Sequence, residues 1–234
     1  SEDTGMTSSD YNSSKSSDNS SSFPKFERSD LEAGLITNSS FQTQKFEGHA
    51  GVYVNDFDKD GIEDLLVSNG KNPTLFENVN GSFRKTGFLS EYSNVAAAHF
   101  FDHDNSGYSD LLLLRRNDEP VFLENKEGRF KEEEVGFERE FTRPYGALSA
   151  DYDRDGCMDL LTHQWGGDEP MDYMRAKEIY ETHPDTRPRL TGYSDFLYQG
   201  NCESFSEMTE EAGIVNASYL TFTGSFIDFT DNGY

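Results

Sequence analysis

The sequence predicts an all-β protein, a partial β-propeller of about three to four repeated units that carry acidic DxDxDG loops. Three observations lead to this prediction. An acidic loop recurs at Asp56, Asp102 and Asp151, which are 46 and 49 residues apart, and a fourth copy begins 77 residues later at Asp228. A strand–turn–strand motif recurs between the loops, and the apolar runs are too short for typical helices. Because propeller blades have roughly 40 to 50 residues in four strands, one repeat matches one blade.

Each repeat supplies about four expected strands. Short apolar runs enter and leave each acidic loop, and such runs are typical of buried strands. The motif between the loops places apolar residues on both sides of a centre rich in Asn and Gly, which is typical of a hairpin. The loop-flanking strands are expected at residues 52–54, 65–67, 95–101 and 111–114, and the hairpins at residues 75–83, 122–130 and 197–205.

Three regions differ in composition. Residues 1–22 contain 10 Ser and only two large apolar residues, so we expect a disordered tether. Residues 23–234 form the expected propeller segment. A polar insert at about residues 166–191 explains the long third interval. A serine-rich start is common after a removed export signal, although an ordinary tail has the same composition.

Charge and hydropathy exclude two classes of protein. The formal net charge is −24, whereas phosphate recognition needs a basic face, so the sequence argues against a nucleic-acid partner. We expect no membrane span, because no apolar run approaches the roughly 18 residues that one requires.

The acidic loops carry oxygen donors at positions that suit Ca²⁺, a cation that takes about six to eight oxygen ligands. Positions 1, 3, 5 and 9 supply side-chain oxygens, position 7 a backbone carbonyl, and Gly at position 6 permits a sharp turn. Carboxylates gathered so closely would repel one another without a cation. The expected ligands are Asp56, Asp58, Asp60, Ile62 and Asp64; Asp102, Asp104, Ser106, Tyr108 and Asp110; Asp151, Asp153, Asp155, Cys157 and Asp159; and Asp228, Thr230 and Asn232.

Two other interpretations of the loops compete with this one. An EF-hand needs a bidentate Glu at position 12, where these loops have Val67, Leu113 and Thr162, so we reject it. Solvated acidic turns without a bound ion remain an alternative. Mg²⁺ fits less well, because it keeps more waters and requires a stricter octahedron.

The loops, each preceded by an apolar strand and followed by Asp-Leu-Leu, resemble the FG-GAP/VCBS repeats of integrin-α-type propellers. Residues 197–214 are similar to the version in ASPIC/UnbV-associated and cartilage-acidic-protein-like proteins, and residues 26–35 look like a weaker copy. The resemblance implies a seven-bladed, extracellular or cell-surface propeller with Ca²⁺ at the blade loops and partners on the propeller face. With only three to four repeats present, we expect the chain to continue into further repeats.

The remaining motifs suggest no chemistry of their own. No nucleophile elbow, P-loop or metalloprotease motif occurs, so we expect no enzyme activity. The five histidines are expected in solvated or packing roles. Cys157 and Cys202 fall in the same repeat, and the sequence favours free thiols there, although a disulfide is open to an exported protein.

The leading functional hypothesis is therefore a non-enzymatic, extracellular, calcium-binding propeller that binds a protein or cell surface. A glycan-binding propeller is the alternative, with Trp165 and the tyrosines of the insert as the aromatic surface. An accessory domain of a secreted enzyme is the third hypothesis.

Overall fold

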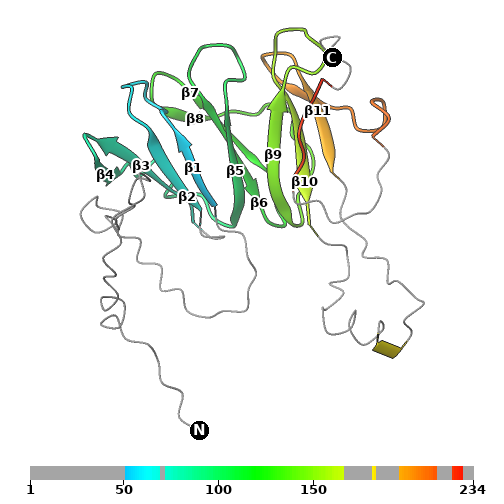
Figure 1. The fold of residues 1–234 in the computed structure, drawn as a ribbon, viewed down its shortest axis with the longest axis horizontal. Coiled ribbons are helices and arrows are strands. Elements are labelled where there is room, and N and C mark those ends of the chain that lie inside the picture. The colour runs from blue at the N-terminus through cyan, green and yellow to red at the C-terminus, as the bar shows by residue number, and fades with distance from the viewer. Residues whose placement is uncertain (1–50, 69–71, 166–180, 183–194, 215–222, 229–234) are drawn as a thin grey trace, which may run out of the picture.

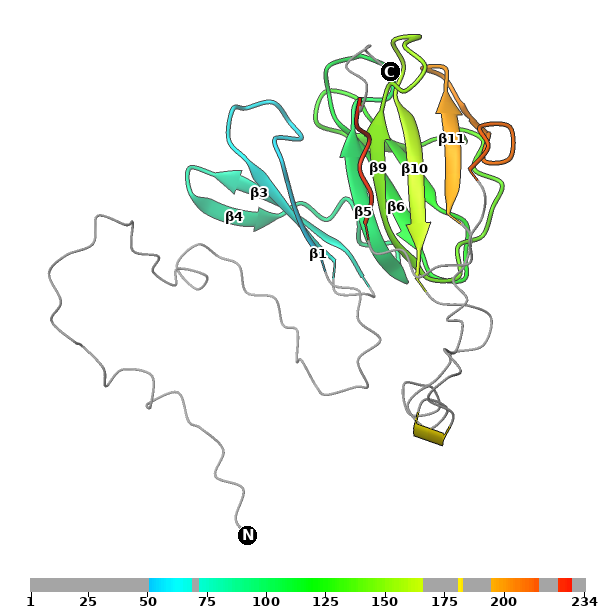
Figure 2. The same cartoon turned by 45° about the vertical axis from the view of Figure 1, so that its right-hand side comes forward.

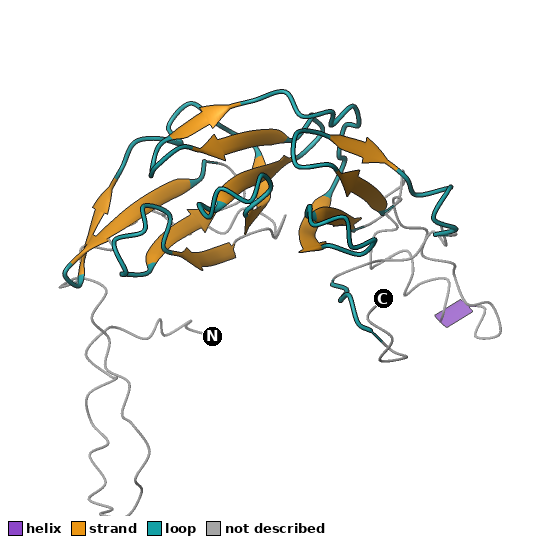
Figure 3. Ribbon diagram, turned by 90° about the horizontal axis from the view of Figure 1, so that it is seen from above, coloured by secondary structure: helices purple, strands orange, loops and turns teal. Residues whose placement is uncertain are grey.

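The computed structural model describes residues 51–68, 72–165, 181–182, 195–214 and 223–228. These residues form three four-stranded antiparallel sheets, each a simple meander of consecutive strands (Figure 1). Seen from above, the sheets lie side by side along an arc (Figure 3). The predicted tether, residues 1–22, and most of the predicted insert, residues 166–191, lie outside the described residues.

The strand bounds follow the repeats. The first sheet contains β1 (Gly51–Asn55), β2 (Asp64–Ser68), β3 (Thr74–Val79) and β4 (Ser82–Lys85). The second contains β5 (Val95–Phe101), β6 (Asp110–Arg115), β7 (Val121–Asn125) and β8 (Phe130–Glu132). The third contains β9 (Pro144–Ala150), β10 (Asp159–Gln164), β11 (Phe196–Gly200) and β12 (Phe205–Glu207) (Figure 2). The expectation of four strands per repeat is confirmed.

The hairpins between the third and fourth strands have the predicted turns. Asn80 and Gly81 both have positive φ, at 53° and 88°, and Glu127 and Gly128 repeat the pattern at 54° and 80°. Two consecutive left-handed residues make the type I′ turn that matches the twist of a hairpin.

The core lies between the sheets, and β6 shows how. Leu111 and Leu113 pack in a cluster with Phe57 and Leu66 of the first repeat. Leu112 and its neighbour two residues on belong to a second cluster, shared with the third sheet. Successive side chains of a strand point to opposite faces, so the four-leucine run packs against both neighbouring sheets. This sandwiched packing is what successive propeller blades require.

The first strands of the sheets lie next to one another. Tyr53 of β1 accepts a hydrogen bond from the backbone N–H of Ala98 in β5 at 3.1 Å. His99 of β5 contacts Ser149 of β9, with 3.0 Å between Nε2 and Oγ. Because β1, β5 and β9 run in the same direction, the three acidic loops that follow them lie at one end of the molecule (Figure 1).

The expectation of free thiols is wrong, because Cys157 and Cys202 form a disulfide. Cys157 belongs to the loop between β9 and β10, and Cys202 to the turn between β11 and β12. In an antiparallel meander these two connections lie at the same end of the sheet. The bridge therefore ties the third acidic loop to the outer hairpin of its own sheet.

Candidate metal centres

The three acidic loops share one backbone conformation. In each loop the residue at position 4 has a left-handed backbone conformation, and position 6 is a glycine with positive φ. Residues with a Cβ seldom adopt a positive φ. The residues at position 4 are Lys59, Asn105 and Arg154, with φ of 60°, 58° and 64°. The glycines at position 6 are Gly61, Gly107 and Gly156, with φ of 88°, 84° and 92°. The predicted turn-forming role of these glycines is confirmed.

Hydrogen bonds from the loop backbone hold the side chains at positions 1, 3 and 5. In the third loop, Asp151 accepts from the N–H of Gly156 at 3.1 Å. Asp153 accepts from Asp155 N–H at 3.1 Å, and Asp155 accepts from Cys157 N–H at 2.8 Å. The first and second loops repeat all three bonds. These side chains therefore fold back over the loop backbone and point into the turn.

The aspartate at position 9 has an additional role that the sequence did not reveal. Asp159 is fully buried; its Oδ2 accepts from Tyr152 N–H at 2.7 Å and its Oδ1 from Gly200 N–H at 2.9 Å. The equivalent Asp64 and Asp110 are also buried, and each makes the same pair of bonds. This residue therefore joins the start of its loop to the end of the third strand.

The structure gathers one potential ligand atom from each of three residues to within 4.8 Å in every loop. In the first and third loops these residues occupy positions 1, 3 and 9. The groups are Asp56, Asp58 and Asp64; Asp151, Asp153 and Asp159; and, in the second loop, His103, Asp104 and Asp110. Exposed Asp60 and Asp155 at position 5, and Asp102 at position 1, lie outside these groups.

The other predicted ligands stay predictions. Ser106 is exposed, and its hydroxyl accepts from Tyr108 N–H at 3.2 Å. The carbonyls of Ile62, Tyr108 and Cys157 at position 7 remain candidates by spacing alone. In the fourth loop only Asp228 is described, because Thr230 and Asn232 lie outside the described residues.

Two buried oxygens in the loops favour a bound cation. Asp102 Oδ1 and Asp151 Oδ1 are inaccessible to solvent and have no hydrogen-bond partner among the described residues. A buried acceptor without a partner is costly, and a metal ion would supply the missing interaction. These residues therefore fit a hard divalent cation.

The raised pKa values of several carboxylates also favour a bound cation. Burial raises the pKa of Asp64 to about 6, against the opposing effect of two backbone N–H groups. Burial likewise raises the pKa of Asp58, Asp102 and Asp159. The ionised form of these four carboxylates is thus disfavoured in the absence of a positive charge nearby, whereas at Asp104 the hydrogen bonds from Ser106 outweigh burial and lower the pKa.

Neighbouring loops touch one another through a few side chains. The Lys59 amine of the first loop lies 4.7 Å from the ring centroid of Tyr108 in the second. Asn105 of the second loop donates to the carbonyl of Gly156 in the third at 2.7 Å. Buried Asn125, at the end of β7, donates to Phe57 O in the first loop at 2.8 Å. The three loops form a continuous edge across the blades.

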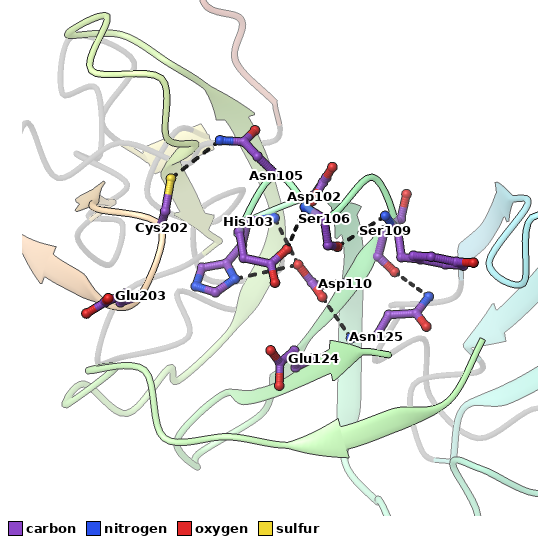
Figure 4. Close-up of polar contacts among 12 residues, drawn as sticks. Asp102, His103, Asn105, Ser106, Ser109, Asp110, Glu124, Asn125, Cys202 and Glu203 are labelled. Atoms are coloured by element: carbon purple, nitrogen blue, oxygen red, sulfur yellow. Dashed lines mark hydrogen bonds and ion pairs between the residues drawn. The ribbon is translucent and has the colours of Figure 1, made fainter. Parts of the chain in front are cut away.

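Sequence reasoning missed His103, for which it predicted only a solvated or packing role. His103 is 5 % exposed, and its Nδ1 lies 3.6 Å from Asp110 Oδ2 (Figure 4). Burial alone would lower the pKa of the imidazole, but the Asp110 carboxylate outweighs burial and raises it. The available signal was position 2 of the other loops, which holds the aromatic residues Phe57 and Tyr152, since such residues favour packing.

Comparison with known protein families matches the FG-GAP-like repeat at two overlapping stretches, residues 56–113 and 102–162. Each match runs from one acidic loop through the next, so it spans one repeat together with the loop of the following repeat. A comparison with curated proteins found no match to the chain. Among the described residues, no helix is long and apolar enough to cross a membrane.

Proposed function

We propose that this chain, in which two FG-GAP-like repeats are matched, is a calcium-stabilised, non-enzymatic β-propeller module that binds a protein or cell surface outside the cell. Repeats of this family indicate an interaction domain of the propeller type. The more specific resemblance of residues 197–214 to ASPIC/UnbV-associated proteins stays a prediction, as does continuation into further repeats.

The observation that carries the calcium proposal is the buried Oδ1 of Asp151 in the third loop, which has no hydrogen-bond partner among the described residues. The other oxygen of this carboxylate already accepts a hydrogen bond from the N–H of Gly156. Ca²⁺ prefers carboxylate and carbonyl oxygens and tolerates irregular geometry, so it suits a loop of this shape. The residues that would hold it are those at positions 1, 3 and 9, with positions 5 and 7 completing the set.

The stabilising effect follows from where the loops lie. Each loop joins the first and second strands of a sheet, and its position-9 aspartate reaches the end of the third strand. A bound cation would also offset the repulsion between the carboxylates. It would favour their ionised form, which burial disfavours. Calcium would thereby stabilise each blade and the line of contacts between the loops.

The disulfide supports an extracellular setting for this module. Cys157 and Cys202 are the only cysteines of the chain, and both are paired. Disulfides persist in oxidising compartments and are rare in the cytosol. The glycan-binding alternative rests mainly on the insert, which lies mostly outside the described residues, and we do not develop it.

Thermal unfolding with and without calcium tests the proposal. A site held at 100 times its dissociation constant stabilises the fold by about 2.7 kcal/mol, so two sites would raise the melting temperature by about 10 to 20 °C. EGTA should abolish this increase, and Mg²⁺ added in the same excess should not restore it. A melting curve that EGTA leaves unchanged would contradict the proposal.

A further inference from the structure

The second acidic loop differs from the other two at the positions that matter for metal choice. Position 5 holds Ser106 instead of an aspartate, so this loop has one carboxylate fewer. Position 2 holds His103, where the first loop has Phe57 and the third Tyr152. The loop has thus exchanged an oxygen ligand for a nitrogen ligand, and mixed nitrogen and oxygen ligands favour zinc-like metals over calcium.

The His103 ring is fixed in place by the blades on either side of it. Its centroid lies 4.9 Å from that of Phe122 on β7 and 5.7 Å from that of Phe205 on β12. The residue is 5 % exposed, and both ring nitrogens lack a hydrogen-bond partner among the described residues. The neutral imidazole would offer a lone pair to a metal ion, which would replace the ion pair between Nδ1 and the Asp110 carboxylate.

One pair of ligand atoms in this group lies close to the separation expected in a tetrahedral metal site. The ligand atoms of His103, Asp104 and Asp110 lie within 4.8 Å of one another, and His103 Nδ1 is 3.6 Å from Asp110 Oδ2 (Figure 4). Tetrahedral zinc with bonds of about 2.0 to 2.1 Å separates its ligand atoms by about 3.3 to 3.4 Å. The His103–Asp110 pair is within a few tenths of an ångström of this separation, and the remaining ligand atom would have to move by up to about 1.4 Å.

We propose that His103, Asp104 and Asp110 form a binding site for a divalent transition metal of the zinc class, separate in its chemistry from the calcium sites of the first and third loops. Three protein ligands leave a fourth position for water or for Asp102, whose buried Oδ1 has no partner among the described residues. Both cysteines are engaged in the disulfide, so no free thiol competes for the metal. The site does not depend on the other two loops taking calcium.

Calorimetric titration of the full chain with Zn²⁺, in about 1 mM Ca²⁺, tests this site. The wild-type protein should bind one Zn²⁺ in the second loop. His103→Phe restores the residue type of the first loop at position 2, so it should preserve packing while weakening Zn²⁺ binding by at least about tenfold. Co²⁺ bound to the wild-type protein should show visible absorption that this variant loses.

Matched variants keep the test decisive. Asp104→Asn should weaken Zn²⁺ binding in the same way. It serves as the test of the zinc site if His103→Phe does not fold. His49→Gln and His183→Gln, outside the described residues, should leave the affinity unchanged. The proposal is overturned if the wild-type protein binds no Zn²⁺, or if the folded His103→Phe and Asp104→Asn variants bind it like the wild type. Calcium binding measured on the same variants tests the proposed function separately, because loss of the zinc site should leave the first and third loops intact.

Discussion

Replacing Asp159 by alanine should destabilise the protein even when no metal is bound. The substitution leaves the N–H groups of Tyr152 and Gly200 without their acceptor in the interior. Two orphaned donors cost about 2 to 6 kcal/mol together. Burial disfavours the ionised form of Asp159, so removing the charge returns part of that cost. We expect a net loss of about 2 to 4 kcal/mol in the free energy of unfolding.

Urea unfolding in EGTA and in Ca²⁺ separates this structural role from a metal-binding role. Asp155→Asn is the matched control, because Asp155 is exposed and an asparagine oxygen can still accept from Cys157 N–H. In EGTA, Asp155→Asn should stay within about 0.5 kcal/mol of the wild type, and it should lose stability only in Ca²⁺. Asp159→Ala should lose stability in both buffers. An Asp159→Ala protein as stable as the wild type in EGTA would refute the reasoning.

Three further predictions concern contacts between residues that are distant in the sequence. Burial lowers the pKa of the His99 imidazole to about 4, against about 6.5 in an unfolded chain, so the stability that depends on the neutral ring is present above pH 6.5 and lost as the pH falls to 4. Between these values the wild type should lose up to about 3 kcal/mol more than His99→Gln, and parallel pH profiles would argue against this. Replacing Cys157 and Cys202 by serine should cost up to about 4 kcal/mol in urea unfolding, from the loop closed across a separation of 45 residues, and a loss below about 1 kcal/mol would contradict the expected constraint. Asn125→Ala should cost about 2 to 4 kcal/mol by leaving two backbone carbonyls in the interior without a donor, whereas an unchanged unfolding midpoint would show that these bonds add nothing.

Much of the fold could be predicted because each repeat carries its own local signals. The four leucines of β6 predict a strand buried on both faces, and Asn80 with Gly81 predicts a tight hairpin turn. Recurrence at 46 and 49 residues then fixes the unit as one sheet. These features depend on short stretches of chain, which a single sequence displays fully.

What the sequence did not reveal depends on contacts between distant residues. Asp159 bonds to Gly200, 41 residues away, and the spacing that marks it as a ligand says nothing of this second role. Cys157 pairs with Cys202 because two connections of one meander meet at the same end, a consequence of topology. His103 is buried because it packs against aromatic residues of two sheets.

Counting the calcium ions bound per chain tests the central claim most directly. Equilibrium dialysis against Ca²⁺ should show at least two ions in the wild-type protein. Asp56→Asn and Asp151→Asn, each at position 1 of its loop, should remove one ion apiece and leave the other in place. A wild-type chain that retains no Ca²⁺, or variants that retain the full number, would contradict the account of these loops as calcium sites.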